Sequence, residues 1–338
     1  MSSTVENKIA GKKRIAVTGA TGFLGNHLTE RFISDGNKVN IFVRDLKKAG
    51  VFEGRVEKIV LGDITDQNRL NELMGGVDIA VHLVSNFRVA AGPPESYRKI
   101  NVEGTKAALR AARAQGVKRF VYCSTIGVHG SVKDTPATEK SPYNPGDLYQ
   151  ETKTEAEQFC LAESKEAGME IVVVRPTSLY GPGDMRMLKM FKMLAKKTFF
   201  TVGPCNENFH AVYIDDIVEG FVKVIEKPGI SGEVFFIGGP EYLPLKAYIN
   251  TAADALGAPP PFLHFPYWFF YSAAVVCESI CVPLGIEPPL HRRRVRFFKN
   301  NRAFSIKKAQ EVLGYQAKVS LKEGMKRTVD WYRQKGFL

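Results

Sequence analysis

The sequence of 338 residues contains only five cysteines, and none of them form a group at metal-binding spacing. Only Cys277 and Cys281 lie near each other, four residues apart and without histidine neighbours. An odd number of cysteines in this arrangement predicts reduced thiols and no metal site. The segment from Met1 to Arg14 lacks the apolar stretch that a secretory signal needs, so we expect a cytoplasmic protein.

The sequence also lacks any recognisable nucleic-acid-binding module. The formal net charge is +12, but the Lys and Arg residues are scattered, except at 12–14 and 291–294. Without a basic surface interleaved with aromatic residues, we expect no nucleic-acid partner. An anionic substrate, a cofactor phosphate or an acidic membrane surface accounts for the positive charge more simply.

Short apolar runs alternate with amphipathic stretches over the first half of the chain. The runs predict six strands, at 14–20, 38–45, 56–63, 77–84, 117–124 and 169–176, and the helices between them include 23–36, 96–115 and 148–168. This alternation is typical of an α/β fold with a doubly wound parallel sheet of the Rossmann type.

The alternation of predicted strands and helices differs between two parts of the chain. We expect residues 12–178 to form a dinucleotide-binding domain that carries the catalytic residues. Residues 179–338 mix short strands and helices without a repeat or a low-complexity linker. We expect them to form a smaller α+β substrate-binding region that packs on the core and returns some elements to the sheet.

A glycine-rich segment, TGATGFLG at 18–25, lies between the first predicted strand and the first predicted helix. Glycines at 19, 22 and 25 allow a tight turn and a close approach of the backbone to a pyrophosphate. The unpaired N–H groups of the following helix would then face the anion. In this context of strand before and helix after, the pattern predicts a dinucleotide site.

The end of the second predicted strand bears on which nicotinamide cofactor binds. Arg44 lies where an acidic residue would accept hydrogen bonds from the adenosine ribose, and a guanidinium favours a 2′-phosphate. We therefore favour NADP(H), with NAD(H) as the alternative if the neighbouring Asp45 meets the ribose. After the third strand, Asp63 and Ile64 are placed to meet the adenine ring, although Asp63 could instead cap a helix.

A phenol and an ammonium group, Tyr149 and Lys153, share one face of a predicted helix at i,i+4 spacing. A nearby positive charge lowers the pKa of a tyrosine, because it favours the ionised phenol. Such a tyrosine can give or take the proton of an alcohol while hydride moves to or from a nicotinamide. We predict that Tyr149 is the acid/base and that Lys153 tunes it.

Taken together, these motifs resemble the extended short-chain dehydrogenase/reductase family. The resemblance rests on the glycine loop, Asn101 in NVEGT, CSTIGVHG, the YxxxK pair, RPTSLYGPG and HAVYIDDIVEG, in the family's order and across essentially the whole chain. That family includes NAD-dependent epimerases and dehydratases and the 3β-hydroxysteroid dehydrogenase-like enzymes. The resemblance implies a catalytic hydroxyl, which the distance from VHG places on Thr125, with Ser124 beside the cofactor.

Further roles are implied by the same resemblance. Asn101 would support a proton-relay water, with a packing role in its helix as the alternative, and we interpret His129 as a turn residue. The helices at 96–115 and 148–168 form a dimer bundle in many relatives, so we expect a homodimer. The full set of expected cofactor-binding residues is Gly19, Thr21, Gly22, Phe23, Leu24, Gly25, Arg44, Asp63, Ile64, Leu83, Val84, Ser85, Ser124, Tyr149, Lys153, Pro176 and Thr177.

The second half of the chain favours an apolar ring substrate. We expect an NAD(P)-dependent oxidoreductase that interconverts a secondary alcohol and a ketone, similar to the 3β-hydroxysteroid dehydrogenases. A nucleotide-sugar epimerase or dehydratase is the alternative, since cations such as Arg186, Lys189 and Lys192 could hold a diphosphate. A non-enzymatic cofactor sensor is less consistent with the chain, because Tyr149 and Lys153 are both retained.

The apolar segment at 265–285 is the main clue to that substrate. It is interrupted only by a few polar residues, among them Glu278, and it falls short of the about 20 uninterrupted apolar residues that a membrane span needs. We expect it to form a buried or substrate-lining helix over the hydride site. Peripheral membrane contact is the alternative, since the basic run that follows would suit acidic headgroups.

Overall fold

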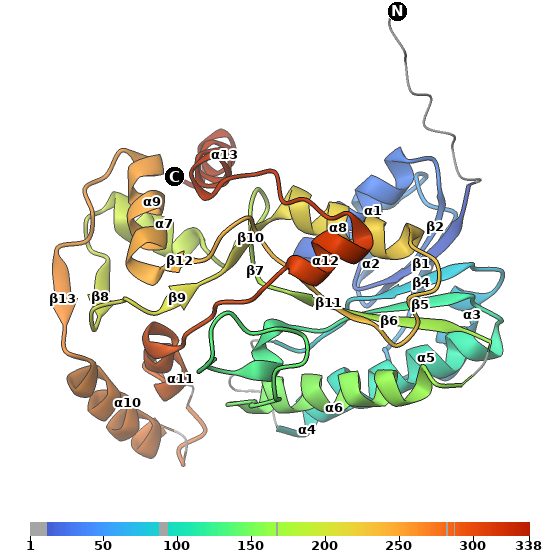
Figure 1. The fold of residues 1–338 in the computed structure, drawn as a ribbon, viewed down its shortest axis with the longest axis horizontal. Coiled ribbons are helices and arrows are strands. Elements are labelled where there is room, and N and C mark those ends of the chain that lie inside the picture. Colours follow the sequence, from blue (N-terminus) through green and yellow to red (C-terminus); the bar gives the residue numbers. More distant parts are fainter. Residues whose placement is uncertain (1–11, 88–93, 167, 282, 287) are drawn as a thin grey trace, which may run out of the picture.

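A seven-stranded parallel sheet forms the centre of the protein (Figure 1), and the computed structural model describes residues 12–87, 94–166, 168–281, 283–286 and 288–338. The strand order is β11-β6-β5-β4-β1-β2-β3. Its strands are β1 (Arg14–Thr18), β2 (Lys38–Val43), β3 (Lys58–Leu61), β4 (Ile79–His82), β5 (Arg119–Cys123), β6 (Glu170–Pro176) and β11 (Val234–Ile237). The prediction of a doubly wound α/β fold is confirmed.

Helices cover both faces of this sheet (Figure 1). One face carries α1 (Phe23–Ser34) and α8 (Ile214–Glu226), and the other carries α3 (Gln67–Met74), α5 (Gly104–Ala114) and α6 (Leu148–Glu163). Along β1, Ile15 and Val17 enter the core under α1 while Ala16 enters the opposite core. Side chains of a strand alternate between faces, so a sheet buried on both sides needs the continuous apolar runs seen in the sequence.

The helix predicted at 96–115 forms as three consecutive pieces. These are α4 (Pro94–Arg98), a π-helical turn (Lys99–Glu103) and α5. Gly104 follows the turn, and a Cβ there would lie 2.8 Å from the Ile64 side chain, so α5 can pack this closely only on a glycine. π-helical turns of this kind often occur at functional sites, and this one contains Asn101.

The second half of the chain contributes to the central sheet and also builds a smaller unit beside it. β11 pairs with β6 and α8 packs against α1, so both halves form the core. The smaller unit contains three two-stranded sheets, β7 (Ser178–Tyr180) with β10 (Ala211–Tyr213), β9 (Asn208–Phe209) with β12 (Leu243–Pro244), and β8 (Phe200–Val202) with β13 (Leu263–Phe265). Its helices are α7 (Leu188–Ala195), α9 (Leu245–Leu256), α10 (Tyr267–Cys281), α11 (Arg292–Arg296) and α13 (Leu321–Gln334).

Short helical pieces complete the described chain. They are α2 (Leu46–Ala49), α12 (Lys307–Leu313) and the 3-10 turns Gly50–Phe52, Ile126–His129 and Phe297–Lys299. α12 packs near β11 and α8, and it holds the C-terminal part of the chain against the core.

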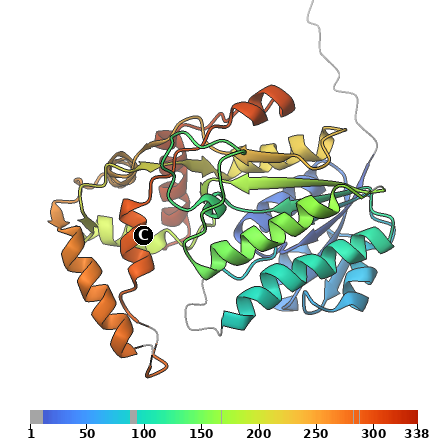
Figure 2. The same cartoon turned by 60° about the horizontal axis from the view of Figure 1, so that its bottom comes forward.

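The apolar segment at 265–285 differs from our expectation. It forms α10, but only Ala274 of this helix is buried, and Val282 lies outside the described residues. In Figures 1 and 2 the helix stands at one end of the molecule, away from the central sheet. The expectation of a buried wall was wrong because most of its large side chains face solvent. None of the described helices has both the length and the apolar character that a bilayer crossing requires.

Candidate active site

The carboxyl ends of four parallel strands bring the predicted site residues together. β1 leads into the glycine loop, β4 into Leu83, β5 into Ser124 and β6 into Thr177. Because β1, β4, β5 and β6 are neighbours in the sheet, these segments lie along one edge. Ligands of open α/β sheets bind in the crevice at this edge.

The glycine loop has the geometry that a pyrophosphate requires. Gly19 adopts a φ of +80°, and the N–H of Gly22 donates to its carbonyl oxygen at 3.0 Å. A Cβ on Gly25 would lie 2.0 Å from the same oxygen, so only glycine lets α1 approach the loop. α1 begins with no side-chain cap and no acidic residue in its first turn. Its first N–H groups are therefore available to an anion, and the loop fits a dinucleotide.

Segments on both sides of the glycine loop extend the predicted dinucleotide site. The N–H of Leu83 donates to the carbonyl of Thr18 at 3.1 Å, and a Cβ on Gly19 would meet the backbone of Val84 at 3.1 Å. At the end of β6, the buried Thr177 hydroxyl has no hydrogen-bond partner among the described residues. Buried hydroxyls rarely remain unpaired, so Thr177 is available to a bound group.

The predicted adenosine end of the dinucleotide site combines positive and negative side chains. Arg44 is exposed directly after β2 and makes no hydrogen bond to the rest of the described chain. Asp45 caps α2, since its carboxylate accepts from the N–H of Lys47 at 2.9 Å. Hydrogen bonds from Thr65 hold the pKa of Asp63 below its ordinary value, with smaller contributions from the positive charges of Lys99 and Arg44. Asp63 thus serves a turn, while Ile64 is buried against α5, and their predicted adenine contacts stay predictions.

Tyr149 and Lys153 lie on the first turns of α6, which starts where Asp147 caps the N–H of Gln150. Lys153 is only 2% exposed; its Nζ donates to the carbonyl of Cys123 at 2.7 Å and lies 4.2 Å from the centre of the Tyr122 ring. Burial lowers the pKa of Lys153 to about 8. Tyr149, by contrast, is half-buried, so it is open to a substrate.

The two hydroxyls after β5 have different environments. Ser124 is buried, and its Oγ donates to the carboxylate of Glu157. Thr125 is half-buried, and its Oγ1 accepts from the N–H of Gly127 at 3.0 Å. Thr125 is therefore the more accessible hydroxyl, and its catalytic role stays a prediction.

A buried ion pair supports this segment from behind. Arg175 and Glu157 are both almost fully buried and form a salt bridge. Tyr143 donates to Glu157 at 2.7 Å, and Arg175 contacts the ring of His129 at 2.8 Å. His129 also contacts the carbonyl of Pro142, and burial lowers its pKa. His129 therefore has a structural place in the turn. Sequence reasoning missed the ion pair, although an arginine within the apolar strand 169–176 was a signal for it.

A second buried network links the glycine loop to α6. Thr18 contacts His82 at 2.8 Å, and the other ring nitrogen of His82 contacts Thr105 at 3.1 Å. Thr105 donates to the carbonyl of Asn101 at 2.7 Å, and the Asn101 amide donates to Thr152 at 2.9 Å. Burial lowers the pKa of His82 to about 3, so this histidine is neutral. Its signal in the sequence was a single polar residue within an apolar strand.

Asn101 itself joins two segments of the site. Its Oδ1 accepts from the N–H of Asn86 at 2.6 Å, and its Nδ2 reaches the carbonyl of the same residue at 3.2 Å. The following residue, Phe87, packs edge-on to the Tyr149 ring at 4.7 Å. Asn101 therefore positions the chain that flanks Tyr149. Its predicted support of a proton-relay water stays a prediction.

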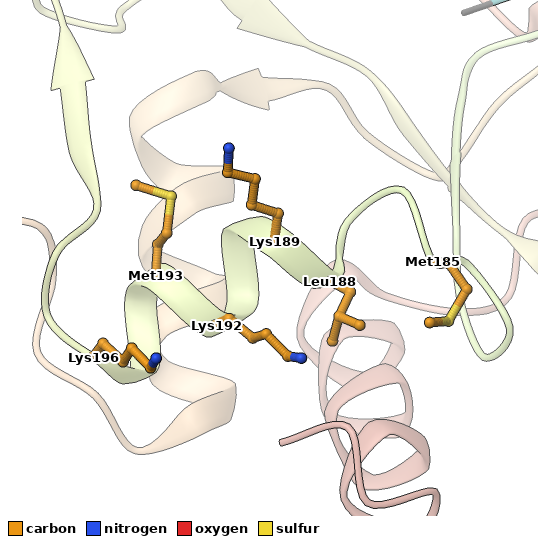
Figure 3. Close-up of a pocket in the computed structure, with 6 residues that line it drawn as sticks. All are labelled: Met185, Leu188, Lys189, Lys192, Met193 and Lys196. Carbon is orange, nitrogen blue, oxygen red and sulfur yellow. The ribbon is translucent and has the colours of Figure 1, made fainter. Parts of the chain in front are cut away.

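Cations lie at the border of the site and beyond it. Arg186 is oriented by Asp184 and lies 5.1 Å from the centre of the Phe23 ring, at the start of α1. It is close enough to Tyr149 for their charges to interact. The lysines of α7 instead line an open groove (Figure 3), together with Met185, Leu188 and Met193. That groove contains none of the predicted catalytic residues.

Comparisons with known proteins identify the family of the chain. The model of the NAD dependent epimerase/dehydratase family matches residues 15–238. The chain is 30% identical to a 3-beta-hydroxysteroid dehydrogenase of Mycolicibacterium neoaurum, over 94% of this chain and 91% of that protein. It is 28% identical to 3beta-hydroxysteroid-dehydrogenase/decarboxylase isoform 1 of Arabidopsis thaliana, over 93% of this chain and 78% of that protein.

A solved structure shows the same fold over nearly the whole chain. The crystal structure of gox2253 superposes with a TM-score of 0.82 at 27% identity, and the match covers 97% of this chain and 100% of that one. The region matched by the family model includes the glycine loop and the YxxxK pair. The chain belongs to the NAD dependent epimerase/dehydratase family of enzymes, which use a nicotinamide dinucleotide.

Proposed function

We propose that the protein is an oxidoreductase that interconverts a secondary alcohol and a ketone on an apolar ring substrate of the 3β-hydroxysteroid kind. The observation that carries the proposal is the arrangement of α6, which carries a half-buried Tyr149 and, four residues later, an almost fully buried Lys153. The names of the relatives from M. neoaurum and A. thaliana support the substrate class.

Three side chains would carry out the proton chemistry. Tyr149 would give a proton to the carbonyl oxygen during reduction and take it back during oxidation. Lys153 would stabilise the phenolate, because a positive charge nearby favours the ionised form. Thr125 would donate to the same substrate oxygen and stabilise the negative charge that develops there. When bound, the nicotinamide supplies or accepts the hydride.

The cofactor would lie along the glycine loop, with NADP(H) favoured over NAD(H). Arg44 is exposed and makes no hydrogen bond within the described chain, whereas the Asp45 carboxylate already caps α2. A free guanidinium suits a 2′-phosphate better than a bare ribose. Titration of both reduced cofactors by fluorescence tests this preference, and tighter binding of NADH would contradict it.

A nucleotide-sugar epimerase is the second candidate, favoured by the position of Arg186 beside Phe23 and Tyr149. One experiment separates the two. The protein is incubated with either cofactor and a panel of 3β-hydroxysteroids, 3-oxosteroids and nucleotide sugars. An oxidoreductase changes the nicotinamide absorbance in proportion to product, whereas an epimerase forms product with no net change. Product without an absorbance change would overturn the proposal.

We also propose a cytoplasmic homodimer that uses the outer surfaces of α4, α5 and α6. These helices lie side by side below the sheet in Figure 1 and are joined by ion pairs, Arg98 with Glu155 and Arg113 with Glu163. Light scattering would give the mass in solution, and a monomer at micromolar concentration would contradict the dimer.

A further inference from the structure

The outward face of α10 is apolar, although it faces solvent. Trp268 is 70% exposed, Phe269 50%, Val276 57% and Ile280 58%. These residues recur at helical spacing, so they form one stripe, which also contains the small exposed side chains of Ser272 and Ser279. Large contiguous apolar surfaces are rare on soluble proteins and mark sites that bind another protein, a membrane or a ligand.

Further exposed apolar side chains flank both ends of the helix. Phe262 and Leu263 precede it, and Leu284 and Ile286 follow it, all with exposed side chains. The opposite face of α10 is the one that packs on the protein, where Ala274 is buried against Val202 and Val295. We call this stripe with its two extensions the apolar face; it consists of Phe262, Leu263, Trp268, Phe269, Val275, Val276, Ile280, Leu284 and Ile286.

Several exposed cations lie beside the apolar face in the described part of the chain. Between Phe262 and Ile286 the only charged residue of the sequence is Glu278, and it forms an ion pair with Arg292. α11 and the following turn carry the exposed cations Arg294, Arg296 and Lys299. Two of these contact α10 directly: Arg296 donates to the Tyr271 hydroxyl at 3.3 Å and Lys299 lies 4.3 Å from the centre of the Tyr267 ring. Among the described residues, the apolar face is therefore bordered by positive charge, and its one acid, Glu278, is paired.

Two occupants of this face fit less well. A membrane-spanning role does not fit, because α10 has 15 residues and about 20 are needed to cross the hydrocarbon core. In a symmetric pair the same face meets itself, so its bordering cations would approach their own copies and repel each other. A partner surface with an apolar region and negative charge around it matches both the apolar side chains and the bordering cations.

We propose that α10 docks on an anionic lipid surface, lying in the plane of the interface. An interfacial helix inserts its aromatic and aliphatic side chains at the headgroup boundary, and Lys and Arg beside it bind acidic headgroups. Tyr267 and Trp268 at its first turn are side chains that favour this boundary. Resting on the proposed function, the docking would place the enzyme where an apolar ring substrate partitions.

The test is sedimentation with lipid vesicles. Full-length protein is mixed with vesicles of phosphatidylcholine alone or with about one-third phosphatidylserine, at low and at high salt. We expect sedimentation with the anionic vesicles and a loss of binding at high salt. The double variant Trp268→Ser/Phe269→Ser should bind at least about tenfold more weakly, because it removes two large apolar side chains from the interface.

A matched control removes two apolar side chains that are also exposed but lie elsewhere on the protein. The double variant Val51→Ser/Leu61→Ser changes residues 58% and 46% exposed and should sediment like the parent protein. Equal binding of the parent and the α10 variant would overturn the inference. A parent protein that does not sediment with anionic vesicles would overturn it as well. It would also be overturned if light scattering shows that the α10 variant dissociates a dimer, since the face would then belong to a second copy.

Turnover distinguishes this inference from the proposed function. The α10 variant should keep its activity on a steroid delivered by cyclodextrin and lose at least about tenfold on the same steroid held in anionic vesicles. Equal turnover of parent and variant on vesicle-borne steroid would contradict the docking alone. Absence of turnover in both proteins with both deliveries would contradict the proposed function and leave vesicle binding to be judged by sedimentation.

Discussion

The buried ammonium of Lys153 should make the stability of the protein depend on pH in a way that one substitution reveals. In the folded protein burial lowers the pKa of Lys153 from 10.5 to about 8. The group is 2% exposed, so little solvent screening reduces this effect. Lys153→Met replaces the ammonium by an apolar side chain of similar length, and the carbonyl of Cys123 loses its donor.

The size of the effect follows from linkage between protonation and folding. At pH 7 the ammonium is charged in both states, and the difference of about 2.5 pKa units costs the folded state about 3 kcal/mol. Between the folded pKa and the unfolded pKa, the unfolded chain binds the proton more tightly, so the wild type gains stability as pH rises. From pH 7 to about pH 9.5 the wild type should gain about 2 kcal/mol relative to Lys153→Met.

Urea unfolding of both proteins at the two pH values measures this difference. The lost hydrogen bond to Cys123 is the same at both pH values, so it cancels from the comparison. Thr154→Val is a matched control on the same helix, since Thr154 is buried, carries no titrating group and donates only to the carbonyl of Gln150. Its stability offset should not change with pH. Unfolding free energies of wild type and Lys153→Met that stay parallel would refute a buried ammonium with a lowered pKa.

Three further substitutions test other parts of the site. Gly25→Ala puts a Cβ 2.0 Å from the carbonyl oxygen of Gly19, so affinity for the reduced cofactor should fall about tenfold or more in a fluorescence titration. Glu157→Gln leaves the buried charge of Arg175 without its partner and should lower the free energy of unfolding by about 3 kcal/mol in urea. Arg44→Ala should weaken NADPH about tenfold and leave NADH within about twofold, because only the former offers a 2′-phosphate to the guanidinium.

Each of these three predictions has a result that would contradict it. Gly50→Ala meets no atom within 4 Å and should bind cofactor like the parent, so an equal loss there would point to a general effect of the change. Glu163→Gln breaks a half-exposed pair with Arg113 and should cost less than about 1 kcal/mol; an equal cost at Glu157 would mean that burial adds nothing. Equal weakening of NADPH and NADH by Arg44→Ala would remove the 2′-phosphate contact.

Much of the central fold was predictable because its signals are local. Continuous apolar runs such as those around Val17 and Val172 indicate strands buried on both faces, and the glycines after β1 indicate a tight turn. The seventh strand, β11, was less certain because its place next to β6 depends on a contact between distant parts of the chain. Its sequence alone says only that it is a short apolar strand.

The parts that the sequence did not predict depend on tertiary contacts. The pairing of Glu157 with Arg175 and the link from Thr18 through His82 join residues from different elements, and no spacing rule predicts their partners. The expectation that α10 is buried was wrong for the same reason. An apolar helix can be buried or exposed, and composition does not distinguish the two until the neighbouring elements are placed.

Turnover by Tyr149→Phe tests the central claim most directly. The protein and this variant are given the reduced cofactor and a 3-oxosteroid, and the fall in nicotinamide absorbance is followed beside a titration of cofactor binding. The phenyl ring keeps the edge-on contact with Phe87 but carries no proton, so cofactor should still bind while turnover falls at least about a hundredfold. Turnover within about tenfold of the parent would contradict the role of Tyr149 as the acid/base.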